Sequence, residues 1–322
     1  MYKRCKLKIL FVFYGSWLGF DWEDRKNKWR QLLFDTAEDT GIIDYVVFIE
    51  QKNREDIRLK AFIDYYKPDL IFIAEHGEER PSSVFILEEL RNWTDRIPVY
   101  AFRADCTSQG DIENAERLTN YVSKIITIDR LESPKGVMNP DKYINLPGPY
   151  SNRIFHCVNA EREYDIVFWG EIRGRQEREQ LLQFIKDNRV TILYPENFGY
   201  QIGGDHALRP PIDIYVSVLQ RSLVSFNIPP HPTNPIFNGR IWESLACGAC
   251  LINFDFIEDT PCSKALDNGT EYISVNRSNI IEVLSAVPDN RDYFSQIGKN
   301  GAAAYKKKYG PERFWKRIMD SL

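Results

Sequence analysis

The segment from Asn238 to Asn253 carries the residues whose types and spacing are best suited to chemistry. Arg240 and Glu243 are three positions apart, so on a helix they share one face, close to the N-terminal end where anions are favoured. A guanidinium can fork onto a diphosphate, and a carboxylate beside it can accept hydrogen bonds from two ribose hydroxyls. The spacing therefore fits a nucleotide-sugar site, although a salt bridge on a solvated helix face would explain it equally well.

A second set of such residues surrounds the first predicted strand-to-helix turn of the C-terminal half. Gly170 would let the backbone approach a phosphate, and Arg173 or Arg175 could neutralise that phosphate at the N-terminus of the following helix. Glycine and arginine also occur in such turns for plain folding reasons. Asn227, at the end of a later predicted strand, and His231 after it are weaker candidates for contact with sugar or phosphate, because the prolines beside them could simply end the strand.

In the N-terminal half, the loop after the first predicted strand combines glycines with aromatic side chains. Trp17, Phe20 and Trp22 would give a stacking surface for a sugar acceptor, or a hydrophobic lid that packs on its own domain. The residues assigned to the acceptor side of the site are Gly15, Ser16, Trp17 and Asp21.

The elements that must position these residues follow one rhythm over the first 130 residues. Short apolar runs alternate with amphipathic stretches, which predicts a parallel sheet with crossover helices. The predicted strands are Leu7–Phe13, Asp44–Ile49, Leu70–Ala74, Pro98–Phe102 and Lys124–Ile128. The predicted helices are Arg25–Thr40, Arg54–Tyr66, Val84–Trp93 and Asp111–Tyr121.

Residues 133–153 interrupt this rhythm with four prolines and no sustained period, which predicts a linker. A second series then predicts strands at Tyr164–Trp169, Val190–Tyr194, Leu223–Phe226 and Cys250–Phe254, with helices at Arg175–Asp187, Ile212–Gln220, Gly239–Cys247 and Ile280–Val287 and two more at the C-terminus. We predict an α/β protein of two Rossmann-like, doubly wound domains that face a central cleft. Their ranges are 1–140, 141–305 and a final segment 306–322, a helix that can cross back to the first domain.

The stretch RIWESLACGACLINF, with the later NGTEYISV and the terminal GKNGAAAYKKKYGPERFWKRI, resembles the C-terminal signature of glycosyltransferases of the GT-B architecture. It is most similar to the group related to the spore-maturation protein CgeB, among the group 1 glycosyl transferases. The likeness covers Tyr164 to about Trp315, and the N-terminal half only by its architecture. It implies that Glu243 binds the ribose of a sugar nucleotide. This chain departs from the family pattern at one position: many retaining members carry a glutamate where this chain has Pro235. The departure leaves open whether transfer retains or inverts the configuration of the sugar.

Two residues of the N-terminal half are candidates for deprotonating an acceptor. His76 follows a predicted strand and has carboxylates beside it, and a base that titrates near neutrality suits removal of a hydroxyl proton. A lone histidine is more often structural. Asp105 resembles an aspartate that recurs after the corresponding strand in the CgeB-like group, so we prefer Asp105 to His76.

Composition narrows the class of protein. The 43% hydrophobic and 27% charged residues are those of an ordinary globular chain, and a net charge of −4 disfavours, without ruling out, a nucleic acid as acceptor. No run approaches the length of a membrane span, and the six scattered cysteines suggest the cytoplasm. The lone pair Cys247 and Cys250 has no partner ligands in the sequence, so we favour packing over metal or redox chemistry.

These features lead to one leading hypothesis, the transfer of a sugar from a nucleoside-diphosphate donor to a glycan or other hydroxyl acceptor. The arginine-rich donor site predicts that no metal and no other cofactor is required. The alternatives are a nucleotide-sugar 2-epimerase of the same fold and an inactive binding protein that keeps the architecture.

Overall fold

The computed structural model describes residues 6–14, 32–50, 59–74, 91, 93–103, 109–127, 140–146, 151–172, 175–200, 210–229, 239–256 and 260–322. These residues form two compact units. The first is built on Leu33–Gly148 with the first strand and the final residues Phe314–Leu322, and the second on Pro149–Arg313. The sequence placed its divisions at residues 140 and 305.

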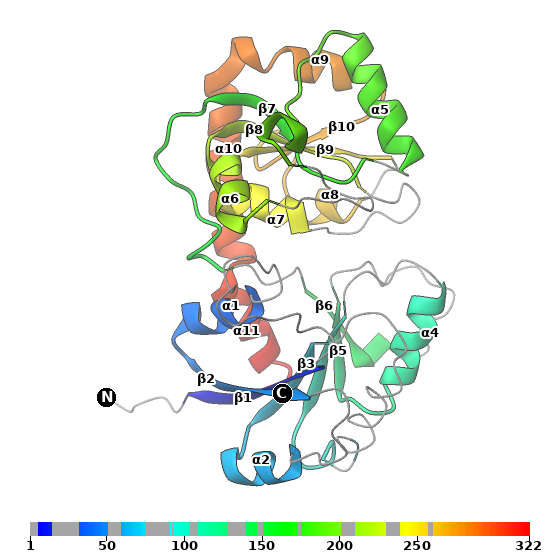
Figure 1. Ribbon diagram of the computed structural model, residues 1–322, viewed down its shortest axis with the longest axis vertical. Helices are drawn as coiled ribbons and strands as arrows, with labels where there is room; N and C mark the ends of the chain where they lie inside the picture. The colour runs from blue at the N-terminus through cyan, green and yellow to red at the C-terminus, as the bar shows by residue number, and fades with distance from the viewer. Residues whose placement is uncertain are drawn as a thin grey trace. The chain divides into compact units, whose positions relative to one another are not determined.

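The first unit contains a six-stranded parallel sheet (Figure 1). Its strands run in the order β2-β1-β3-β4-β5-β6, where the chain turns back at β1, as a doubly wound sheet does. Apolar strand residues are buried on both faces: α2 and α4 cover one face, and α1 and α11 cover the other. The elements are β1 (Leu7–Tyr14), α1 (Leu32–Thr40), β2 (Ile43–Glu50), α2 (Leu59–Tyr66), β3 (Leu70–Ala74), β4 (Val99–Arg103), α4 (Gln109–Leu118), β5 (Lys124–Thr127), the 3-10 turn Pro140–Lys142, β6 (Tyr143–Asn145) and α11 (Pro311–Met319).

Two features of this unit differ from, or add to, the sequence prediction. The predicted linker contains the strand β6, which pairs in parallel with β5. This strand was missed because it has only three residues, with prolines nearby, and so shows no recognisable pattern. The helix α11 joins the sheet from the far end of the chain. The indole of Trp315 donates to Thr36 Oγ1 (3.1 Å), and the hydroxyl of Tyr100 donates to the carbonyl of Ser321 (2.7 Å). The predicted helix Val84–Trp93 lies almost entirely outside the described residues.

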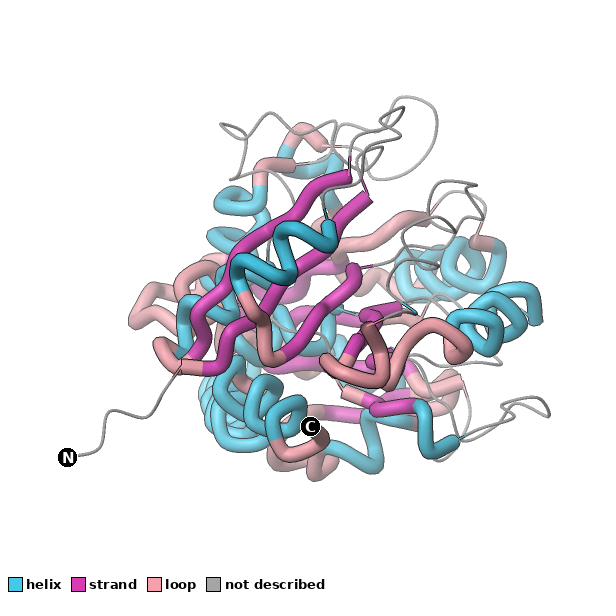
Figure 2. The backbone as a smooth tube through the Cα atoms, turned by 90° about the horizontal axis from the view of Figure 1, so that it is seen from below, coloured by secondary structure: helices cyan, strands magenta, loops and turns pink. Residues whose placement is uncertain are grey.

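The second unit contains a four-stranded parallel sheet in the order β10-β9-β8-β7. In Figure 2 its strands and those of the first sheet appear in magenta and the helices in cyan. One face packs on α5, α9 and the start of α10, and the other packs on α6, α7, α8 and the end of α10. The elements are β7 (Tyr164–Phe168), α5 (Gln176–Asp187), the 3-10 turn Pro195–Phe198, α6 (Ile212–Gln220), β8 (Ser222–Asn227), α7 (Gly239–Ala246), β9 (Cys250–Phe254), α8 (Pro261–Ala265), β10 (Ile273–Val275), α9 (Ile280–Ser285), the 3-10 turn Pro288–Asn290 and α10 (Arg291–Lys308).

The predicted strand Val190–Tyr194 is wrong in extent. Only Leu193 bridges to Val167 of β7, and Pro195, which has no backbone N–H, begins a 3-10 turn directly afterwards. The bridge nevertheless lies on one edge of β7 while β8 lies on the other. The chain therefore reverses its winding direction at β7, and ligands of such sheets bind beyond the carboxyl ends of the strands at a reversal of this kind.

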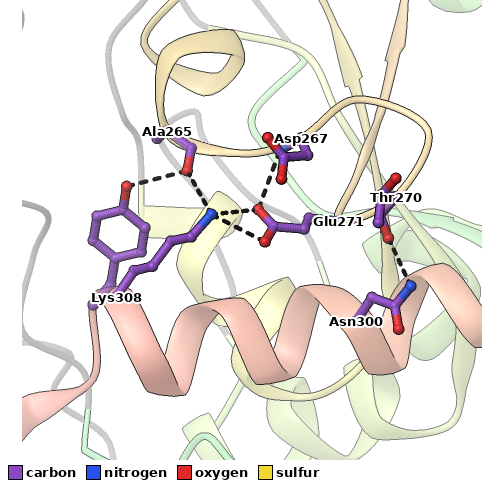
Figure 3. Close-up of polar contacts among 7 residues, drawn as sticks. Ala265, Asp267, Thr270, Glu271, Asn300 and Lys308 are labelled. Carbon is purple, nitrogen blue, oxygen red and sulfur yellow. Dashed lines mark hydrogen bonds and ion pairs between the residues drawn. The ribbon is translucent and has the colours of Figure 1, made fainter.

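The C-terminal end of α10 packs against helix α7. Tyr309 places its ring 4.3 Å from the ring of Trp242 on α7. Figure 3 shows that Lys308 pairs with Glu271 (2.8 Å) and reaches the carbonyl of Ala265. The hydroxyl of Tyr309 donates to the same carbonyl (3.2 Å). Among the described residues, no helix is long and apolar enough to cross a membrane.

Candidate functional site

The turn after β7 lies in direct contact with the guanidinium of Arg240. A Cβ atom on Gly170 would lie 2.6 Å from Nη1 of Arg240 and 3.0 Å from the ring of Phe168, so a side chain here would have to displace the Arg240 guanidinium. The glycine thus lets the guanidinium of Arg240 lie close to the backbone of this turn, while phosphate binding at the turn stays a prediction. The contact places Arg240 at the carboxyl end of β7, where the sheet reverses its winding.

Helix α7 holds Arg240 and Glu243 rigidly. Its residues from Ile241 to Ala246 are all buried, and Gly248 ends it with a left-handed backbone (φ +74°), as the sequence predicted. The hydroxyl of Ser244 donates to the carbonyl of Arg240 (2.6 Å) and lies 2.7 Å from the hydroxyl of Ser225 on β8. The helix is thus fixed to the sheet at the level of the two charged residues.

Arg240 carries an unsatisfied hydrogen-bond donor. Its Nη1 is buried and has no hydrogen-bond partner within the described part of the chain. A buried donor without a partner costs roughly 1–3 kcal/mol, and more when it is charged. Such a group is explained when a ligand supplies the acceptor, and an anion does so best.

Arg178 is a third cation of this cluster, which the sequence analysis did not single out. It is 2% exposed, and its guanidinium donates to the carbonyls of Ile228 (2.5 and 3.1 Å) and Glu171 (2.9 Å). Burial, and then the positive charges of Arg240 and Arg175, lower its pKa to about 9. Three guanidinium groups therefore share one neighbourhood. The i,i+3 spacing of Arg175 and Arg178 was the signal available in the sequence.

Glu243 lies beside Arg240 in an environment with little solvent. It is 3% exposed, and its Oε2 accepts a hydrogen bond from the hydroxyl of Tyr215 on α6 (2.7 Å). Burial raises the pKa of Glu243 to about 7, although Tyr215 and Arg240 both pull it down. The sequence predicted a readily ionised carboxylate near a helix N-terminus, and the structure differs because the burial of this side chain outweighs that effect.

Tyr215, which bonds Glu243, packs against Trp169, and no sequence pattern singled out either side chain. Their ring centroids are 5.2 Å apart, and Trp169 also packs on Phe198 (5.5 Å). The indole Nε1 of Trp169 is buried and, within the described residues, has no hydrogen-bond partner.

The other two described candidates, Arg175 and Asn227, have partners of their own. Arg175 precedes α5, is partly exposed and lies 3.8 Å from the carboxylate of Glu171. Asn227 ends β8, is buried and donates its amide to Asn253 (2.6 Å). Arg175 thus lies at the cation cluster, whereas the amide nitrogen of Asn227 is committed to the neighbouring strand.

Several predicted site residues lie outside the described part of the chain. They are Arg173 on the donor side, His76 and Asp105 as candidate bases, Gly15, Ser16, Trp17 and Asp21 on the acceptor side, and also His231 and Pro235. Their roles stay predictions. Cys247 and Cys250, by contrast, are described: both thiols are free and buried, and burial raises their pKa values, which agrees with a packing role.

Three solved structures are similar to both units of this chain. They are Anabaena Alr3699/HepE in complex with UDP-glucose (TM-score 0.59, 12% identity, 98% of this chain and 100% of that one), the sucrose-phosphate synthase of Thermosynechococcus elongatus (0.56, 10%, 98% and 100%) and an α1,3-fucosyltransferase with GDP (0.53, 10%, 99% and 92%). Identities this low show the fold, which is the predicted GT-B architecture. No curated protein matches the sequence significantly.

The sequence of the second unit identifies the family. Residues 152–320, more than half of the chain, match the glycosyl transferase-like family. This match contains β7, α5, α6 and α7, and with them every described residue of the cluster around Arg240 and Glu243. The chain therefore belongs to the glycosyl transferase-like family, and it is a glycosyltransferase.

Proposed function

We propose that this glycosyltransferase takes its sugar from a nucleoside-diphosphate donor, transfers it to a hydroxyl acceptor and needs no metal ion. In this proposal the diphosphate lies against Gly170 and Arg240, with Arg175 and the undescribed Arg173 beside it. The ribose hydroxyls donate to the carboxylate of Glu243. The solved structures of similar fold support the donor class, because their complexes contain UDP-glucose in one case and GDP in another.

The observation that carries the proposal is the incomplete polar cluster at the carboxyl end of β7. A buried guanidinium nitrogen of Arg240, which has no partner among the described residues, lies close to the backbone of Gly170. Its neighbour one turn along α7 is the buried carboxylate of Glu243, to which Tyr215 gives the one hydrogen bond found within the described part of the chain. An anion next to a pair of hydroxyl groups would complete both, and a nucleoside diphosphate presents these groups on adjacent parts of one molecule.

The transfer itself exchanges one C–O bond for another. The acceptor oxygen forms a bond to the anomeric carbon, while the bond from that carbon to the terminal phosphate oxygen breaks and its electron pair leaves with the nucleoside diphosphate. The acceptor proton passes to a base, for which we propose Asp105 in preference to His76. Negative charge develops on the diphosphate during this step, so fixed guanidinium groups beside it would stabilise the transition state.

A screen of sugar nucleotides tests the donor class. Melting temperatures are measured with UDP-, GDP-, ADP- and CDP-sugars, because a ligand at 100 times its dissociation constant stabilises the folded protein by about 2.7 kcal/mol. The donor selected in this way is then incubated with the enzyme and a panel of hydroxyl acceptors, with and without EDTA.

The proposal predicts a stabilising donor, a glycosylated product and turnover that EDTA leaves intact. Loss of turnover in EDTA with rescue by manganese would contradict the metal-independent part. A donor whose sugar changes configuration without any acceptor would instead indicate an epimerase. Failure of every sugar nucleotide to stabilise the protein would contradict the donor class itself.

A further inference from the structure

We propose that Tyr215 is a positioning residue of the donor site, whose hydroxyl holds the Glu243 carboxylate in the ionised form that accepts the ribose hydroxyls. The inference rests on the proposed function, since it assumes that Glu243 binds ribose. It adds a residue on another helix, α6, and a dependence of donor affinity on pH that this residue controls.

Burial, ring packing and a hydrogen bond hold the Tyr215 hydroxyl in place. The side chain is 1% exposed, and its ring packs against those of Trp169 (centroids 5.2 Å apart) and Phe155 (6.3 Å, at 74°). The hydroxyl lies 2.7 Å from Oε2 of Glu243. A phenol has a single hydrogen to donate, and here it is donated to the carboxylate, where the bond favours the ionised form of Glu243.

One carboxylate oxygen remains for a ligand. The hydrogen bonds among the described residues give Oε2 the Tyr215 hydroxyl and leave Oε1 without a donor. An ionised carboxylate has about four lone-pair positions on its two oxygens, so two ribose hydroxyls can donate to it while Tyr215 stays bound. A protonated carboxyl loses one of these positions and presents a donor in its place.

Among the described residues, the charged and titratable groups that interact with Glu243 come from two helices. Tyr215 approaches from α6, and Arg240 and Cys247 lie on α7 itself. Burial raises the pKa of Glu243 to about 7, while the Tyr215 hydrogen bond and the charge of Arg240 lower it. Burial and the adjacent carboxylate raise the pKa of Tyr215 far above its usual range, so this side chain stays a neutral donor throughout. If the Tyr215 hydroxyl were removed, the pKa of Glu243 would therefore rise, and Glu243 would take up a proton at a higher pH.

The experiment compares the binding of two ligands between pH 5.5 and pH 9. UDP and GDP are the first probes, and the one that binds more tightly is compared with its 2′,3′-dideoxy analogue, which carries the same titrating phosphates but no ribose hydroxyls. The ratio of the two dissociation constants isolates the ribose contribution at each pH. In the wild-type enzyme we expect this ratio to favour the natural ligand roughly tenfold or more at pH 9 and to fall through a midpoint near pH 7.

Removing one oxygen from Tyr215 should move that midpoint. For Tyr215→Phe we expect an increase of about one pH unit, with affinity at pH 9 close to that of the wild type. The matched control is Tyr272→Phe, the same change on a buried tyrosine of the same core cluster, which should leave the midpoint in place. Melting curves establish that each variant is folded.

A second variant shifts the midpoint in the opposite direction and keeps every packing contact. Site-specific 3-fluorotyrosine at position 215 has a more acidic hydroxyl, which is a stronger donor, so the midpoint should fall below that of the wild type. This test also decides the matter if Tyr215→Phe fails to fold.

The outcomes separate this inference from the function on which it rests. If neither diphosphate binds wild-type enzyme at any pH, the proposed donor class is wrong. If the natural ligand binds but fluorotyrosine and Phe leave the midpoint unchanged, Tyr215 does not control Glu243. If Tyr215→Phe weakens both ligands equally at every pH, Tyr215 contributes only packing and the inference is overturned.

Discussion

Two buried polar clusters lie at the carboxyl edge of the second sheet, and they differ in how completely their groups are paired. We call the first the strand ladder: Asn227, Asn253, Asp255 and Ser274 pass hydrogen bonds across β8, β9 and β10. The second, the donor cluster, contains Gly170, Tyr215, Arg240 and Glu243 on the turn after β7 and on α6 and α7.

The ladder is closed by its own residues. The amide of Asn227 donates to Asn253 (2.6 Å), the amide of Asn253 donates to Asp255 (2.6 Å), and Ser274 donates to the other oxygen of Asp255. Burial raises the pKa of Asp255, and these hydrogen bonds counteract it. In the donor cluster, by contrast, a guanidinium nitrogen has no partner among the described residues. The difference indicates that the ladder stabilises the fold, and it supports our proposal that a ligand completes the donor cluster.

The largest expected effect on stability comes from removing a hydrogen-bonding side chain from the strand ladder. Asn253→Ala would leave the buried amide of Asn227 and the carboxylate of Asp255 each short of a partner, so we expect a loss of about 3 kcal/mol in the free energy of unfolding. Urea denaturation measures this loss. Asn300→Ala is the control, because Asn300 donates to Thr270 on the exposed surface and should cost about 1 kcal/mol or less. Equal losses in the two variants would remove the distinction between the ladder and ordinary surface bonds.

The donor cluster should respond in the opposite direction when its carboxylate is neutralised. The raised pKa of Glu243 stabilises the folded state fully below the ordinary value of 4.5, and this contribution is lost as the pH rises through about 7. Glu243→Gln should therefore gain about 3 kcal/mol relative to wild type at pH 8.5, since each pKa unit is worth about 1.4 kcal/mol, and gain little at pH 4.5. Unfolding at the two pH values checks this. If the stability difference between Glu243→Gln and wild type were the same at both pH values, the pKa of Glu243 would not be raised by burial.

Paired and unpaired polar groups can also be compared between two arginines, Arg178 and Arg240. Arg178→Met removes a guanidinium that donates to two backbone carbonyl groups, and we expect it to lower the free energy of unfolding by about 2 kcal/mol. At about pH 5, where Glu243 is protonated and gains nothing from the charge of Arg240, Arg240→Met removes the unpaired Nη1 and should leave stability within about 0.5 kcal/mol or increase it. Denaturation of both variants in the absence of nucleotide gives the answer. A larger loss from Arg240→Met would mean that the protein itself satisfies this group.

The smallest expected effect concerns the support behind α7. Lys308 pairs with Glu271, which is largely buried, whereas the Lys316–Asp320 pair is exposed (Figure 3 shows the former). We expect Lys308→Met to cost about 1 kcal/mol and Lys316→Met no more than about 0.3 kcal/mol. The two melting curves measure this difference. Similar curves would show that the Lys308 pair adds nothing beyond a surface contact.

Long periodic elements could be predicted from the sequence because their apolar patterns reflect burial directly. α6 and β9 have the predicted bounds, β8 is one residue longer than predicted at each end, and α7 is one residue shorter at its C-terminal end. Short edge elements could not be predicted. β6 is three residues beside prolines, and around Leu193 only a single residue pairs with β7, although its apolar run reads as a strand.

The candidate site could be predicted only where charge and glycine stand close together in the chain. Arg240, Glu243 and Gly170 were found in this way, and the structure brings them into one cluster. Tyr215 lies in an apolar helix pattern that any core tyrosine would satisfy, so its bond to Glu243 depends on the packing of α6 against α7. The burial that raises the pKa of Glu243 is likewise a tertiary property, which helix position alone cannot supply.

The most direct test of the account measures which part of a nucleotide each residue of the donor cluster binds. Dissociation constants are determined calorimetrically at pH 8.5 for the nucleoside diphosphate, its nucleoside and its 2′,3′-dideoxy form, with wild type, Arg240→Met and Glu243→Gln. Arg240→Met should weaken both diphosphates about tenfold to a hundredfold and leave the nucleoside unchanged. Glu243→Gln should weaken the diphosphate and the nucleoside and leave the dideoxy form unchanged. Equal losses for all three ligands in both variants would contradict the assignment of phosphate to Arg240 and ribose to Glu243.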